Sequence, residues 1–223
     1  MAAITDFRGV AQLGELALPP ANYSVTARFL GVIPGVLEQI VDPVYSAATS
    51  PALTLNLIGS ASCPRASLNR AVNLSGFCYL TAPVNGKIEI VDGALILGSG
   101  RVDQKIDQHG AGGVQILQGA SVRGFISERG PGDITVHGEV GGNLVESGPG
   151  DIVVGVSGLA KGLVTEADDG SVRIQGRVQG NLSESGTGGV VIETTGIVQA
   201  NATESGPGGL VNQGTITGQV RQD

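Results

Sequence analysis

The fold is decided by four consecutive segments: PGDITVHGEVGGNLVESG (131–148), PGDIVVGVSGLAKGLVTEAD (149–168), DGSVRIQGRVQGNLSESG (169–186) and TGGVVIETTGIVQANATESG (187–206). Apolar residues alternate within each segment, as at Ile134, Val136 and Val140. A period of two indicates β-strands, because successive side chains point to opposite faces. Segments this short leave no room for a helical crossover. They predict a coil that winds once per segment, with about three short strands, each pairing in parallel with the next coil.

One inward-facing column can be followed outward from these segments at spacings of 18 or 20 residues. It comprises Ile88, Ile106, Ile126, Leu144, Val164, Leu182, Ala202 and Val220. We predict that these side chains form the core of an all-β, single-stranded parallel β-helix over residues 84–223. Coils of unequal length favour the right-handed form, since a left-handed β-helix repeats an apolar residue every six positions.

Residues 1–83 lack this regularity and are predicted to form an N-terminal cap or attachment region of mixed short strands. Leu53, Leu55 and Leu57 alternate as in a strand, and residues 52–80 are compatible with an irregular first coil or a small β cap. Residues 35–42 lie between Pro34 and Pro43 and are compatible with one short helix.

Composition excludes several classes of partner. The formal net charge is −7, and the only lysines are Lys87, Lys105 and Lys161. Nucleic acids and anionic membranes select clustered basic residues, so we expect binding to neither. No stretch is long and apolar enough for a transmembrane helix, so none is expected. We expect a secreted or cell-surface protein whose signal peptide has been removed.

Cys63 and Cys78 are the only cysteines, and they allow either two buried thiols or one disulfide. The disulfide is the favoured alternative, because scarce lysine and a texture rich in Gly, Ser and Thr suit an exported protein.

A column of carboxylates lies two residues after the apolar column. It comprises Glu128, Glu146, Glu166, Glu184 and Glu204, with Gln108 and Gln222 at its ends and Ile90 one coil earlier. Glutamates stacked about 5 Å apart repel each other, so burial is expected to raise their pKa values. Hydrogen bonds from Ser147, Ser185, Ser205 and the corner glycines are one expected source of relief. Three interpretations stay open: a corner ladder that accepts backbone N–H groups, a cation-binding ridge that takes calcium, and a catalytic carboxylate pair.

The repeat region offers little else for catalysis. The units vary by two residues, so no long loops wall a cleft, and Phe125 is the only aromatic residue after residue 83. His109 and His137 are not at equivalent coil positions, and neither has an obvious partner in the sequence. The sequence therefore predicts a protein that is not an enzyme and has no cofactor.

In coil length, G-x-I-x-V texture and lack of inserted loops, residues 84–223 resemble two groups of solenoids: adhesin repeats of the filamentous-haemagglutinin type and bactofilins. The resemblance implies structural or adhesive work and transfers no functional residues. The cysteines and the large N-terminal region fit bactofilins poorly.

We expect a structural or adhesive surface protein that self-associates, head to tail or laterally, into an extracellular assembly or filament. Surface polysaccharide and other surface proteins are further possible partners. The alternative is a carbohydrate-active enzyme, or a phage-type depolymerase or tail-fibre module, on a β-helix scaffold.

Overall fold

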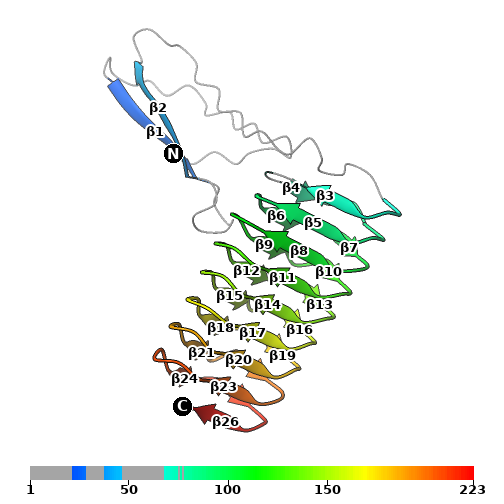
Figure 1. Ribbon diagram of the computed structural model, residues 1–223, viewed down its shortest axis with the longest axis vertical. Helices are drawn as coiled ribbons and strands as arrows, with labels where there is room; N and C mark the ends of the chain where they lie inside the picture. Colours follow the sequence, from blue (N-terminus) through cyan, green and yellow to red (C-terminus); the bar gives the residue numbers. More distant parts are fainter. Residues whose placement is uncertain (1–21, 29–37, 47–67, 75, 77) are drawn as a thin grey trace.

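The computed structural model describes residues 22–28, 38–46, 68–74, 76 and 78–223. Its main body is a three-sided stack of short parallel strands that runs from β3 at one end to β26 at the other (Figure 1). The predicted all-β parallel solenoid with three strands per coil is confirmed. No helix occurs in the part of the chain that the structure describes, so no helix there is long and apolar enough to cross a membrane.

Each side of the stack is one parallel sheet. The nine-stranded sheet contains β3 (Val72–Leu74), β5 (Ile88–Val91), β8 (Ile106–His109), β11 (Ile126–Glu128), β14 (Leu144–Glu146), β17 (Val164–Glu166), β20 (Leu182–Glu184), β23 (Ala202–Glu204) and β26 (Val220–Gln222). The eight-stranded sheet contains β4 (Cys78–Leu80), β6 (Leu95–Leu97), β9 (Val114–Ile116), β12 (Ile134–Val136), β15 (Ile152–Val154), β18 (Val172–Ile174), β21 (Val190–Ile192) and β24 (Leu210–Asn212). The seven-stranded sheet contains β7 (Gly100–Val102), β10 (Ala120–Val122), β13 (Glu139–Val140), β16 (Leu159–Ala160), β19 (Arg177–Val178), β22 (Ile197–Val198) and β25 (Thr215–Ile216).

The inward-facing side chains of all three sheets form one continuous apolar core. The predicted column is buried at seven of its eight positions, from Ile88 to Ala202, each no more than 1% exposed. Val220 is 53% exposed, because among the described residues no further coil covers β26. The prediction that Val220 is a core residue is therefore wrong.

The stack begins earlier than residue 84. β3 pairs in parallel with β5, β4 pairs in parallel with β6, and Leu68 forms a parallel bridge with Val84. The predicted boundary between cap and solenoid is thus about 16 residues too late, and the irregular first coil is the correct alternative for residues 68–80. Spacings of 16 and 17 residues between these first pairs hid them from a search for units of 18 or 20.

The helix compatible with residues 35–42 is also wrong over the residues that the structure describes. Residues Glu38–Ser46 form strand β2, which pairs antiparallel with β1 (Asn22–Arg28). Both segments are rich in β-branched and aromatic residues, which favour strands over helices.

Coil length alternates because one turn alternates. The turn from the eight-stranded to the seven-stranded sheet has two residues after β12, β18 and β24 and four residues after β15 and β21. The four-residue turns are closed by backbone hydrogen bonds, from Gly158 N–H to Gly155 O at 2.7 Å and from Gly196 N–H to Glu193 O at 2.8 Å. The other two corners keep the same length from coil to coil through this region.

Candidate functional site

The five glutamates of the carboxylate column, which we call the glutamate column, lie inside the stack. Each is the third residue of its strand, in β11, β14, β17, β20 or β23, and each pairs in register with the next. They share the inward direction of the apolar residue two positions earlier, and all five are 0% exposed. Gln108, also 0% exposed, pairs in register with Glu128 and extends the column by one coil.

One carboxylate oxygen of each glutamate accepts backbone N–H groups from the corner that follows its strand. The donors are Gly130 at 2.9 Å from Glu128, Gly148 at 2.7 Å from Glu146, Asp168 at 2.8 Å and Gly170 at 3.2 Å from Glu166, Gly186 at 2.7 Å from Glu184, and Gly206 at 2.8 Å from Glu204. These are the contacts that the corner-ladder interpretation predicts. They satisfy donors that would otherwise be unpaired at a buried corner.

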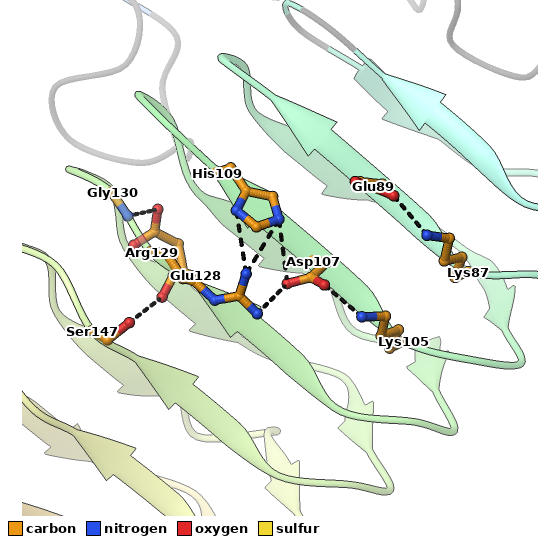
Figure 2. Close-up of polar contacts among 9 residues, drawn as sticks. All are labelled: Lys87, Glu89, Lys105, Asp107, His109, Glu128, Arg129, Gly130 and Ser147. Atoms are coloured by element: carbon orange, nitrogen blue, oxygen red, sulfur yellow. Dashed lines mark hydrogen bonds and ion pairs between the residues drawn. The ribbon is translucent and has the colours of Figure 1, made fainter.

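The serines do not contact the carboxylates as expected. Ser147, Ser185 and Ser205 instead donate to the backbone carbonyl oxygens of Glu128, Glu166 and Glu184, at 3.3, 3.5 and 3.3 Å (Figure 2 shows the first). Each serine directly follows an inward glutamate, so strand alternation points its side chain outward.

Burial gives the glutamates the titration behaviour of weak acids. Loss of hydration raises the pKa of Glu146 to about 10 and the pKa values of Glu128 and Glu184 to about 7. Neighbouring carboxyls reinforce this, because two charges about 4.8 Å apart repel by about 3 kcal/mol at an effective dielectric constant of about 20. The hydrogen bonds from Gly130, Gly148 and Gly186 act in the opposite direction and are outweighed.

The column lies in the core rather than on a solvent-facing ridge. Within the described ranges, no group of three or more His, Cys, Asp or Glu side chains is arranged to hold a metal ion. Calcium prefers six to eight oxygen ligands. The geometry therefore favours the corner ladder over the calcium ridge.

A second cluster of charged side chains lies on the outer face of β5, β8 and β11 (Figure 2). Asp107 is its centre, with Oδ2 at 2.5 Å from Lys105 Nζ and Oδ1 at 3.1 Å from Arg129 Nη2 and 3.7 Å from His109 Nε2. The guanidinium of Arg129 also lies 3.3 and 3.4 Å from the two ring nitrogens of His109. The sequence reading of His109 as a residue with no obvious partner is therefore wrong.

Two signals in the sequence point to this cluster. Asp107 and His109 are two residues apart on one strand, so they share the outer face, and Arg129 follows His109 by the 20-residue coil spacing. Lys105 also lies 5.3 Å above the ring of Phe125, which joins the only aromatic residue of the repeat region to the cluster.

The cluster holds Asp107 in its charged form. Partial burial alone would raise the pKa of Asp107, but the hydrogen bond from Lys105 and the charges of Arg129, Lys105 and His109 outweigh it and lower the pKa below its usual value. A lowered folded-state pKa stabilises the fold above the unfolded-state pKa, and this stabilisation is lost as pH falls through the folded-state pKa.

We expect Asp107→Asn to lower the free energy of unfolding by about 1 kcal/mol at pH 7 and to have little effect near pH 3, where the carboxyl is protonated. Urea unfolding of the variant and the unmodified protein at both pH values measures the difference. Glu139→Gln is the control, because Glu139 forms an exposed ion pair with Lys161 at 2.6 Å. Equal losses at pH 3 and pH 7 would show that the charge of Asp107 contributes nothing.

The disulfide between Cys63 and Cys78 stays a prediction. Cys78 is fully buried at the start of β4, and Cys63 lies outside the described residues. The resemblance to filamentous-haemagglutinin repeats and bactofilins also stays a hypothesis, because parallel solenoids of many kinds share this shape. Comparisons of the chain with protein families, curated proteins and solved structures found no match.

Proposed function

We propose that the protein is a structural or adhesive module of an exported surface assembly and that it self-associates through its sheets. The observation that carries the proposal is the constant coil. From β8 to β26, corresponding strands follow each other at 18 or 20 residues, so three flat sheets continue along the stack without inserted loops. Flat, extended faces suit contact with other extended molecules, such as surface polysaccharide, another surface protein or a second copy of the chain.

The terminal coil supports end-to-end contact in particular. Within the described residues, no strand pairs with the far sides of β24, β25 and β26, and Val211 and Val220 are 52% and 53% exposed. Unpaired strand edges invite a strand from a neighbouring molecule. A contact between opposite ends is heterologous and builds an open filament unless rotation closes a ring.

Val220 offers a clean test of this contact. At the equivalent positions Leu182 and Ala202, the N–H group donates to the carbonyl oxygen of the following coil, from Asn201 and Gln219, at 2.9 Å. The N–H of Val220 therefore faces the open side of β26. Proline at this position removes that outward donor and leaves the hydrogen bonds inside the stack in place.

We expect the unmodified protein to form elongated oligomers at high concentration and Val220→Pro to shift the population to monomers, at least tenfold in dissociation constant. Sedimentation velocity and negative-stain microscopy measure the change, and Val145→Thr, on the outer face of β14, is the control. A strictly monomeric unmodified protein at high concentration and ordinary salt would contradict self-association.

A second candidate function, a carbohydrate-active or tail-fibre module, is favoured by the outer cluster around Asp107. Charged side chains beside an aromatic ring suit a sugar with acidic substituents. A polysaccharide-degradation assay run beside the microscopy distinguishes this candidate from the first, because adhesion alone releases no product.

A further inference from the structure

Six buried oxygen atoms of one column lack a hydrogen-bond donor. They are Oε2 of Glu128, Glu146, Glu166, Glu184 and Glu204, and Oε1 of Gln108; among the described residues, no donor reaches any of them. Each side chain is 0% exposed. Buried polar atoms in native proteins are almost always paired, so a row of six indicates something that the heavy atoms alone do not provide.

The missing partner is a donor, and the surroundings offer no cation in its place. The charged groups that act most strongly on Glu128, Glu146 and Glu184 are all acids. They are Asp133, which faces Glu128 from the following corner, and the other members of the glutamate column. Asp133 is itself held partly protonated, since burial raises its pKa. Ionising the whole column would place five negative charges side by side without a counterion.

Gln108 supplies independent evidence, because it is not an acid and has the same deficit. Its Nε2 donates to the carbonyl oxygens of Gly93 and Gly110 at 3.1 and 3.2 Å. Those two acceptors fix which end of the amide is nitrogen, since an oxygen there would face two other oxygens. Oε1 of Gln108 is therefore a fixed acceptor, buried at the end of the column next to Glu128.

Neighbouring carboxyls are close enough to share protons. Glu146 hydrogen-bonds with both Glu128 and Glu166, and Glu166 hydrogen-bonds with Glu184. A carboxyl must be protonated to donate to another carboxyl. The oxygen left over from each backbone hydrogen bond is Oε2, which is therefore the atom that carries the proton.

We propose that the glutamate column is a chain of shared protons that locks the coils together at neutral pH and is released when the pH rises. Each protonated Oε2 donates to the carboxyl of the preceding coil, and the chain ends on Oε1 of Gln108. The inference is independent of the proposed function, because it concerns the core of the stack and not its outer faces or ends.

The direction of the pH dependence follows from the titration of the column. The folded-state pKa values of about 7 for Glu128 and Glu184 and about 10 for Glu146 lie above the unfolded value of 4.5. The folded protein therefore holds protons that the unfolded chain has lost. The stabilisation is full below pH 4.5 and is lost in two stages, as pH rises through about 7 and then through about 10.

Glu146→Gln tests the lock, because glutamine keeps the shape of a protonated glutamate and supplies a donor at every pH. The column already accommodates a fully buried glutamine at position 108. Between pH 6 and pH 9, the folding equilibrium constant of the unmodified protein should fall by up to tenfold per pH unit for each proton held. The variant should lose at least tenfold less over the same range.

Glu139→Gln is the matched control, since Glu139 lies in the same coil as Glu146 and its side chain is 48% exposed. It should leave the pH dependence unchanged. A carboxyl carbon NMR titration of the unmodified protein reads the same protons without any substitution. Stability that stays flat from pH 6 to pH 9, or a titration that places all five glutamates at or below about 4.5, would overturn the proposal.

Added salts distinguish protons from a bound cation. Calcium chloride, magnesium chloride and potassium chloride are each added at pH 8.5 to the unmodified protein and to Glu146→Gln. The proposal expects equal, small changes in melting temperature for both proteins. A large calcium-specific rise in the unmodified protein, absent from the variant, would show that the column holds a cation and would reject the proton chain.

Discussion

Replacing Leu144 with Asp is expected to lower the free energy of unfolding by about 4 kcal/mol or more. Leu144 is 0% exposed in β14, with Ile126 and Val164 directly before and after it in the stack. Aspartate at this position leaves a cavity and an unpaired carboxyl in an apolar core. It also adds an acid two residues from Glu146, which already shares its surroundings with Glu128 and Glu166.

Val145→Thr is the matched control for this substitution. Val145 is the next residue of the same strand and lies on the outer face, so the change is expected to alter stability by less than about 0.5 kcal/mol. Urea unfolding followed by circular dichroism measures both variants. Equal effects from the two substitutions would contradict the inward direction of Leu144.

Gly150→Ala is expected to destabilise the stack by about 3 kcal/mol, although it adds a single methyl group. A Cβ on Gly150 would lie 1.8 Å from the carbonyl oxygen of Gly132, one coil earlier. The atom in the way is backbone, so two coils would have to separate. The same contact recurs along this corner, at 1.7 Å for Gly170 with Gly150 and 1.8 Å for Gly188 with Gly170.

Gly119→Ala separates this steric effect from the effect of backbone conformation. Gly119 has a φ of +87°, which an alanine adopts only with strain, but no atom lies within 4 Å of a Cβ built there. We expect a loss of about 1 kcal/mol. Thermal and urea unfolding compare the two variants, and a Gly150→Ala effect no larger than that of Gly119→Ala would show that the corners can open without cost.

The sequence predicts the middle of the stack well because each strand reports its own inward face. Alternation alone places Leu144 and Glu146 on the same side, and a repeat of 18 or 20 residues then brings Glu146 beside Glu128 and Glu166. The fold class and seven core positions follow from these two regularities. The right-handed sense of the coil stays a prediction.

The predictions that failed concern places where a residue depends on something other than its own strand. Val220 has the pattern of a core residue, but its exposure depends on whether a further coil lies beyond it. The first coil at β3 and β4 escapes detection because its spacing is irregular. Ser147 contacts a carbonyl of the previous coil, and His109 contacts Arg129 of the next, and neither partner is near in sequence.

The alternating turn between the eight-stranded and seven-stranded sheets has a consequence for how such a chain can lengthen by gene duplication. A copied or deleted single coil would place two turns of equal length side by side, whereas a segment of 38 residues, such as 149–186, restores the original order. The sequence bears the mark of this longer unit: the two 18-residue coils 131–148 and 169–186 are identical at nine positions, Gly142, Asn143 and Leu144 matching Gly180, Asn181 and Leu182. The heritable module is a pair of unlike coils.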